Sequence, residues 1–251
     1  MRIFLVSTIS ALVLWSPLCA APADQPSDTI RASRFQSKQL ILPAALVAWG
    51  AFGINNGWWH RINDDTRKWM ADLRGNHPCR ADDYLRFVPS AVHLGLGILN
   101  AKAKHNLKER LLVSATAHAA MAAVTQGLKL IIDERRPDGS ADDSFPSGHT
   151  ALAFTGAELT RAEYGTGYGV AAYAVACGVA FLRLYNDDHW LNDVIAGAGI
   201  GILSTRIGYW LLPAYQKAFR RMREKRFAAI SACPYYNPSD RNIGFSVSMT
   251  F

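Results

Sequence analysis

Apolar residues are gathered in segments longer than ten residues, with polar stretches between them. The segments are rich in Ala, Gly, Leu and Val and do not alternate apolar with polar positions, so helices are favoured over strands. They lie at about 40–54, 87–100, 111–132, 148–160, 168–185 and 191–212. The pattern predicts an all-α fold, a bundle of about six apolar helices. Gly165 and Gly167 separate two of them, and Pro213 is expected to end the last.

The beginning of the chain has a different pattern. Arg2 precedes an apolar run from Ile3 to Trp15, and Pro17 and small residues follow, which is the layout of a secretory signal peptide. An uncleaved anchor helix is the alternative interpretation. The expected organisation is a signal peptide at 1–23, a linker at 24–38, a helical domain at 39–212 and a tail at 213–251.

The tail combines a basic stretch with a strand-like end. It is basic from Gln216 to Arg226, and from Ile243 to Phe251 it alternates apolar and polar residues like a β-strand. One strand cannot form a transmembrane barrel. A short extended segment lying on the helical domain is therefore expected.

Composition limits the class of protein without choosing a partner. With 50% hydrophobic and 19% charged residues, the chain is too apolar to be disordered. Its 27 Lys and Arg against 20 Asp and Glu give a net charge of +7, which suits nucleic acid, an anionic membrane surface or an anionic substrate. A mean hydropathy of +0.02 leaves membrane association open. The cysteines are not spaced like zinc ligands, so no metal site is expected from them.

The first candidate site residues are Lys129 and Arg136, which are seven residues apart, with Pro137 directly after Arg136. If the helix continues to Pro137, two helical turns bring both side chains to one side of its end. A cation at a helix C-terminus also interacts favourably with the helix dipole, so either residue alone is weak evidence for a site. The acidic residues around them are expected to tune charge, not to bind metal: Asp133, Glu134 and Asp138.

A second group is Ser144-Phe-Pro-Ser-Gly-His-Thr150, which opens the next helix. Pro146 and Ser147 fit the entry and cap positions, and Gly148 lets a ligand approach the backbone. The free N–H groups of a helix N-terminus form an anion site, so a phosphate is expected there without a metal. His149, in the first turn, is placed to donate a proton.

The third group lies between Phe181 and Asp193. His189 and Asp193 are four residues apart at the start of an apolar helix, so the carboxylate can hold one ring nitrogen and leave the other free. An imidazole held in this way is prepared to act as a nucleophile. Arg183, at the end of the preceding helix, supplies a third cation.

In this order and on three apolar helices, the three groups resemble the phosphatidic acid phosphatase type 2 and vanadium-dependent haloperoxidase superfamily. The spacings that carry the resemblance are Lys129-x6-Arg136-Pro137, Pro146-Ser-Gly-His149 and Arg183-x5-His189-x3-Asp193. The resemblance covers about Arg110 to Leu212. The family usually has Ser before the third-motif Arg. Here that position is Leu182, which puts one hydrogen bond to phosphate in question but none of the charged groups.

The resemblance implies a mechanism without metal or cofactor. His189 attacks phosphorus to give a phosphohistidine, Asp193 orients it, His149 protonates the leaving oxygen, and water hydrolyses the intermediate. The residues implied in binding and stabilising the phosphate are Lys129, Arg136, Ser147, Gly148 through its N–H, and Arg183.

The expected function is that of a metal-independent phosphatase acting on a membrane lipid phosphate. Candidate substrates are phosphatidic acid, phosphatidylglycerophosphate, undecaprenyl pyrophosphate and the phosphate of lipid A. A soluble periplasmic acid phosphatase, a vanadate haloperoxidase and a catalytically silent binding protein are the alternatives. The expected partners are a lipid phosphate and the membrane, with no nucleic acid. The expected location is the bacterial inner membrane, with the active site facing the periplasm.

Counting membrane crossings exposes a conflict within these expectations. Basic residues before the first catalytic helix and after the last suggest that both flanks are cytoplasmic. A cleaved signal puts the mature N-terminus outside, yet three apolar segments precede Pro137, an odd number where an even one is needed. Either one of the first two segments does not span, or the signal is uncleaved and spans, or the whole domain is periplasmic.

Overall fold

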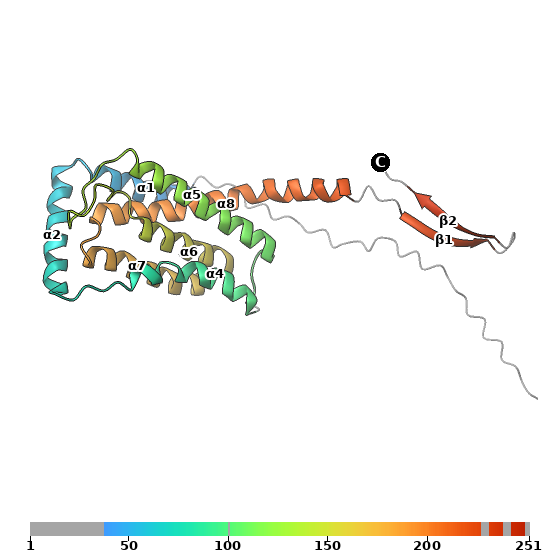
Figure 1. Ribbon diagram of the computed structural model, residues 1–251, viewed down its shortest axis with the longest axis horizontal. Coiled ribbons are helices and arrows are strands. Elements are labelled where there is room, and N and C mark those ends of the chain that lie inside the picture. Colours follow the sequence, from blue (N-terminus) through green and yellow to red (C-terminus); the bar gives the residue numbers. More distant parts are fainter. Residues whose placement is uncertain (1–37, 100, 227–230, 238–241, 249–251) are drawn as a thin grey trace, which may run out of the picture. The chain divides into compact units, whose positions relative to one another are not determined.

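The computed structural model describes residues 38–99, 101–226, 231–237 and 242–248. The expected signal peptide, and the linker up to residue 37, lie outside the described residues. The helices are α1 (Lys38–Phe52), α2 (Gly57–Arg74), α3 (Asp82–Leu85), α4 (Val88–Ile98), α5 (Leu107–Lys129), α6 (Gly148–Tyr164), α7 (Thr166–Tyr185) and α8 (Leu191–Arg226) (Figure 1). The strands are β1 (Ser231–Asn237) and β2 (Asn242–Ser248). The predicted all-α class is confirmed.

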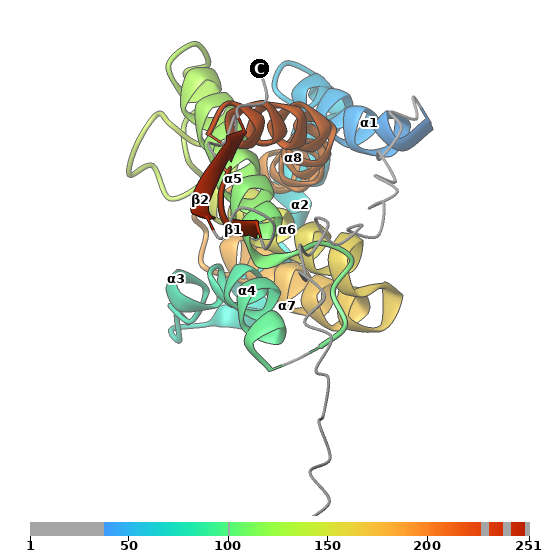
Figure 2. The ribbon, with the colours of Figure 1, turned by 90° about the vertical axis from the view of Figure 1, so that its right-hand side faces the viewer.

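Helix α8 is the central element of the bundle. It packs against α1, α5 and α6, and α6 in turn packs against α4 and α7 (Figure 2). At its start α8 is parallel to α6, because Gly197 faces Ser147 and Thr205 faces Thr155. It is antiparallel to α5, whose first turn is joined to it by a hydrogen bond from Gln216. The ends of α5 and α7 therefore lie at the same end of the bundle as the starts of α6 and α8.

Glycines bring the backbones of α6 and α8 into contact. A Cβ atom on Gly197 would lie 2.6 Å from the carbonyl oxygen of Ser147, and one on Gly201 would lie 2.4 Å from that of Ala151. Both distances are shorter than any real carbon contact, so larger residues would push the helices apart. Small residues at four-residue spacing allow this close approach.

Two expected helix ends are wrong. Helix α8 does not stop at Pro213 but continues through it to Arg226, across the expected domain boundary. A proline inside a helix removes one backbone hydrogen bond, and contacts with α5 hold the helix on both sides of this interruption. Beyond the proline, Tyr215 is hydrogen-bonded to Thr116. Conversely, α5 ends at Lys129 and does not reach Pro137.

Helix α2 was not expected from the sequence, because polar and charged residues outnumber apolar ones along it. Asn56 caps it by accepting hydrogen bonds from the N–H groups of Trp58 and Trp59. Its buried positions, Trp59, Asn63 and Met70, recur at helical spacing. One polar residue in this stripe obscured the pattern.

The strand-like end of the tail is paired. β1 and β2 form an antiparallel hairpin in which Ser231 lies opposite Ser248 and Asn237 opposite Asn242. The expectation of a single extended segment is corrected to a two-stranded hairpin over the described residues. β1 was missed because its sequence, SACPYYN, lacks regular alternation.

Three described helices are long and apolar enough to cross a membrane: α5, α7 and the Leu191–Met222 part of α8. Only 28% of the apolar stretch of α5 and 33% of that of α7 are buried inside the bundle. Apolar side chains of both helices therefore face outward, as expected for lipid contact. Helices α1 and α2 together have the length of a span but bend by 92° between them.

Candidate active site

The three motifs meet where α5 and α7 end and α6 and α8 begin. His189 is in the turn between α7 and α8, with its side chain 2% exposed. The charges of Arg183, Lys129, Arg136 and His149 all act on its imidazole. Residues from three separate stretches of the chain thus surround one buried ring.

His189 and Asp193 form the expected pair. Nδ1 of His189 lies 3.4 Å from Oδ2 of Asp193, one helical turn away. The same carboxylate oxygen accepts hydrogen bonds from the hydroxyl of Ser144 and, at 2.9 Å, from the N–H of Trp190. These two donors fix the carboxylate, which in turn holds the imidazole.

The surroundings of His189 keep its imidazole neutral. Burial lowers the pKa of His189 well below its ordinary value, and the cations of Arg183, Lys129 and Arg136 lower it further. If the hydrogen bond to Asp193 holds the proton on Nδ1, Nε2 keeps a free lone pair. This is the form of histidine that can act as a nucleophile.

Arg183 is held by two acidic residues. Its NH1 lies 2.7 Å from Oδ2 of Asp82 and 2.9 Å from Oδ2 of Asp188, and its side chain is only 4% exposed. Asn186 ties the same carboxylate of Asp82 to the backbone of Cys79. Within the described residues, Nε of Arg183 has no hydrogen-bond partner, so it remains available for an anion.

Lys129 and Arg136 converge on Asp143. Nε of Arg136 lies 2.8 Å from Oδ1 of Asp143, and Nζ of Lys129 contacts both its carboxylate and its carbonyl oxygen. The predicted reason for their proximity, a continuous helix, is wrong. An isolated bridge between Glu134 and Asp143 brings the segment after α5 alongside the one before α6.

The second motif begins α6 at the same place. Ser147 occupies the N-cap position, but its hydroxyl interacts with that of Thr150 and makes no capping bond. A Cβ on Gly148 would meet no atom within 4 Å, so the space beside this backbone is open. His149 lies 3.0 Å from Oδ1 of Asp83 and 2.9 Å from NH1 of Arg86, both through Nε2.

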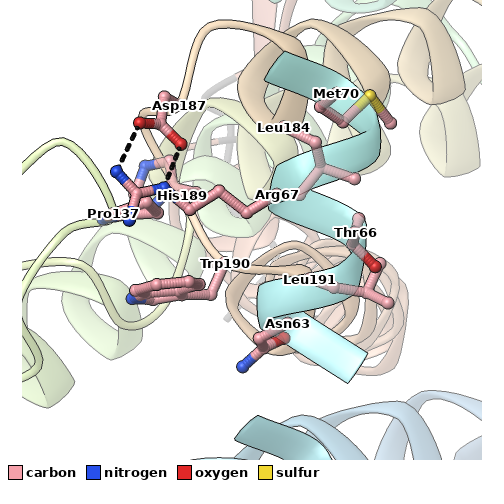
Figure 3. Close-up of a pocket in the computed structure, with 10 residues that line it drawn as sticks. All are labelled: Asn63, Thr66, Arg67, Met70, Pro137, Leu184, Asp187, His189, Trp190 and Leu191. Carbon is pink, nitrogen blue, oxygen red and sulfur yellow. Dashed lines mark hydrogen bonds and ion pairs between the residues drawn. The ribbon is translucent and has the colours of Figure 1, made fainter. Parts of the chain in front are cut away.

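Helix α2 covers the His189 side of the site. Asn63, Thr66, Arg67 and Met70 of α2 line a pocket with His189 (Figure 3). Both carboxylate oxygens of Asp187 accept hydrogen bonds of 2.9 Å from Arg67. The guanidinium of Arg67 also lies 5.8 Å from the ring centroid of Trp190.

Several residues of the site were not found from the sequence. Those that contact motif residues are Asp82, Asp83, Arg86, Asp143 and Asp188. The first three lie in or beside the short helix α3, about a hundred residues before Arg183. Acidic residues next to a basic motif are a weak signal, and no spacing rule links residues so far apart.

A sequence model of the PAP2 superfamily matches residues 110–217. This segment, which holds all three motifs, therefore belongs to the PAP2 superfamily. The family predicted from the motif order is confirmed.

Within this family, the chain is 35% identical over 154 residues to a lipid A 1-phosphatase of Porphyromonas gingivalis. The alignment covers 60% of the chain but 35% of the relative, so the chain spans about a third of that protein's length.

Two solved structures are similar in fold. The first transmembrane PAP2 type phosphatidylglycerolphosphate phosphatase from Bacillus subtilis matches with a TM-score of 0.53 and 17% identity, over 70% of this chain and 96% of that one. Aquifex aeolicus LpxE matches with a TM-score of 0.47 and 22% identity, over 59% of this chain and 94% of that one. The Bacillus structure supports the fold alone.

The carboxylate of Asp143 lies between Lys129 and Arg136, where an anionic ligand would have to bind. Burial works to raise the pKa of Asp143, but the hydrogen bond from Arg136 and the charge of Lys129 together lower it, so the carboxylate is ionised. We expect Asp143→Asn to tighten binding of inorganic phosphate or vanadate by up to about fivefold, the size of a partly exposed ion pair.

Isothermal titration of the purified protein with phosphate or vanadate measures this change. Asp142→Asn is the matched control, because it removes the same charge from an exposed neighbour. Weaker anion binding in Asp143→Asn would contradict the prediction and show that this carboxylate holds the two cations in place.

Proposed function

We propose that the chain is a metal-independent phosphatase that hydrolyses a membrane lipid phosphate through a phosphohistidine at His189. The observation that carries the proposal is a buried imidazole that lies 3.4 Å from a carboxylate oxygen of Asp193 and is acted on by the charges of Lys129, Arg136 and Arg183. Such a site attracts an anionic phosphate and presents a nucleophile to it.

In the first step, the lone pair on Nε2 of His189 attacks phosphorus, and the bond from phosphorus to the leaving oxygen breaks. His149 gives its proton to that oxygen, and Asp193 stabilises the positive charge on the attacking ring. In the second step, water attacks phosphorus, His149 takes a proton from it, and the phosphorus–nitrogen bond breaks. The products are inorganic phosphate and the dephosphorylated lipid.

The cations act on the charge that is spread over the phosphate oxygens. Lys129 and Arg183 approach from the ends of α5 and α7, Arg136 from the segment that follows α5, and Ser147 and the N–H group of Gly148 from the start of α6. Fixed positive groups of this kind stabilise a phosphoryl-transfer transition state. The opening beside Gly148 gives a phosphate access to this N–H group.

Lipid is the substrate class that the outer surface favours. The outward faces of α5 and α7 are apolar over most of their length, which disfavours a soluble acid phosphatase. The relative named lipid A 1-phosphatase adds support for a lipid phosphate. We propose the four classes named from the sequence as candidates: phosphatidic acid, phosphatidylglycerophosphate, undecaprenyl pyrophosphate and lipid A phosphate.

We propose an inner-membrane location with the site facing the periplasm. The basic residues Lys102 and Lys104 precede α5 and Lys108 is in its first turn, so all three lie away from the site, as do the basic residues that follow Pro213 in α8. Positive flanks favour the cytoplasmic side. Helix α1 runs antiparallel to α8, since Gln39 contacts Arg206 and Gly50 faces Asn192. The chain thus enters α1 from the basic side, which is the side proposed to be cytoplasmic.

The test of function is release of inorganic phosphate from a panel of lipid phosphates in detergent micelles. We expect activity on at least one lipid, no turnover by His189→Ala, and a reduced rate for Asp193→Asn because its imidazole is poorly oriented. Acid-labile labelling from a phosphorus-labelled lipid should appear on the wild type and not on His189→Ala. Undiminished turnover by a folded His189→Ala protein would overturn the mechanism.

The site should work without a divalent metal. Three cations and a helix N-terminus can bind and stabilise the phosphate charge, as a metal ion does in other phosphatases. Activity should therefore survive excess chelator. It should fall in micromolar to millimolar vanadate. Phosphate release with and without chelator measures this. Activity lost in chelator and restored by magnesium would contradict the prediction.

The orientation can be tested at Cys79, which is exposed and lies at the site end, where Asn186 binds its backbone. In a chain whose only cysteine is Cys79, a membrane-impermeant thiol reagent should label it in intact spheroplasts. Lys108→Cys in a cysteine-free chain is the matched control and should be labelled only after permeabilisation. The reverse pattern would place the site on the cytoplasmic side.

A further inference from the structure

Two carboxyl groups meet behind the nucleophile. Oδ2 of Asp193 interacts with His189 and accepts hydrogen bonds from Ser144 and Trp190. Its other oxygen, Oδ1, is buried without a donor among the described residues, and so is Oε2 of Glu134. The side chains of Glu134 and Asp193 are nevertheless close enough for a hydrogen bond, since each acts on the pKa of the other as a hydrogen-bonding neighbour. Two carboxylate oxygens can form such a bond only when a proton lies between them.

A chain of amides indicates which oxygen of Glu134 carries this proton. Nδ2 of Asn63, on α2, donates to Oδ1 of Asn192 at 2.8 Å. The amide of Asn192 must then point its own Nδ2 outward, and this group donates to Oε1 of Glu134 at 3.2 Å. Because Oε1 accepts, the acid proton belongs on Oε2, the oxygen without another partner.

We propose that Glu134 is a positioning residue that acts as a neutral carboxylic acid, whose Oε2–H donates a hydrogen bond to Oδ1 of Asp193. Both oxygens of Asp193 then accept hydrogen bonds that fix its carboxylate in place, and this carboxylate orients His189. The inference rests on the proposed phosphatase function, since orientation of His189 matters only if it is the nucleophile.

The charges around Glu134 agree with a retained proton. Burial raises the pKa of Glu134 to about 8, and the negative charge of Asp193 contributes, whereas His60 from α2 acts in the opposite direction. Asp143, in the segment bridged to Glu134, already has its carboxylate bound by Lys129 and Arg136. A folded pKa above the ordinary one means that the proton is present at neutral pH and is lost as pH rises through about 8.

Loss of this proton would harm catalysis in two ways. The hydrogen bond to Asp193 would disappear, and a second negative charge would face both Asp193 and the incoming phosphate. We therefore expect kcat/KM of the wild type to fall above an apparent pKa of about 8, by about tenfold for each further pH unit.

Glutamine separates this role from a purely structural one. In Glu134→Gln, an amide N–H can replace the acid proton toward Asp193, while the amide oxygen accepts from Asn192. This variant should keep kcat at pH 7 within about threefold of the wild type, and its alkaline decline should vanish because an amide does not titrate. Glu134→Ala should lose about tenfold or more in kcat at every pH, the effect of removing a hydrogen bond to a charged group.

The matched control is Asp133→Asn, which removes a negative charge from the exposed neighbouring position. It should keep the alkaline decline of the wild type. An alkaline decline that persists unchanged in Glu134→Gln would overturn the proposal, because the proton would then belong to another group. The wild type alone also tests it, since an active enzyme with kcat/KM constant through pH 9 excludes a titrating Glu134.

Failure of the proposed function has a different signature, namely a wild type inactive on every lipid phosphate at pH 7. Infrared spectroscopy then still tests the shared proton. The wild type should show the carbonyl band of a buried carboxylic acid at pH 7, and this band should disappear above pH 9 and be missing in Glu134→Gln. An identical band in both proteins would overturn the assignment.

Discussion

The site depends on the contact between the first turns of α6 and α8. The backbone N–H of Ser147 donates a hydrogen bond of 3.1 Å to the carbonyl oxygen of Asp193. One residue of the second motif is thereby fixed to one residue of the third. The bond can form because Gly197 has no side chain to hold the helices apart. A larger residue at position 197 would push the two motifs apart without changing any charged group.

Around this contact, every buried or half-buried cation of the motifs is matched by an acid. Arg183 is bound by Asp82 and Asp188, and the other two cations share Asp143. Unpaired buried charges are strongly destabilising, so the fold needs these partners before any substrate arrives. Those of Arg183 are nearly inaccessible, whereas Asp143 is 45% exposed. The pairing that a phosphate can replace at least cost is therefore the one at the surface.

The sequence predicted the parts of the site that local spacing determines. His189 and Asp193 meet because four residues make about one helical turn. The six apolar segments correspond to α1, α4, α5, α6, α7 and α8 to within a few residues, apart from the extension of α8. Lys129 and Arg136 meet for another reason, since the helix between them ends early. Their proximity comes from pairing of segments before and after Gly139, a turn with a positive φ of 75°, which no helical periodicity encodes.

Contacts between residues far apart in the sequence could not be predicted from residue spacing. Asp82 reaches Arg183 across 101 residues and Asp83 reaches His149 across 66. Their short helix of four residues is too brief to give a periodic signal. Helix α2 was hidden by its polar composition, although it supplies Asn63 and Arg67 to the site. Local pattern thus predicts the motif residues of the candidate site, and the tertiary fold determines the residues that hold them.

The two histidines lie in different surroundings, and this difference gives the proposed reaction a direction. His189 lies under α2 with its side chain 2% exposed, while that of His149 is 20% exposed and that of its partner Asp83 is 46% exposed. A phosphoryl group must reach the enclosed ring, and the leaving oxygen must face His149. The lipid part of the substrate therefore belongs on the open side, beside Asp83 and Arg86, where it can depart while the phosphoryl group stays on His189. Since α2 covers the opposite side, the water that completes the reaction must enter by the path that the lipid has vacated, where His149 is in place to take its proton.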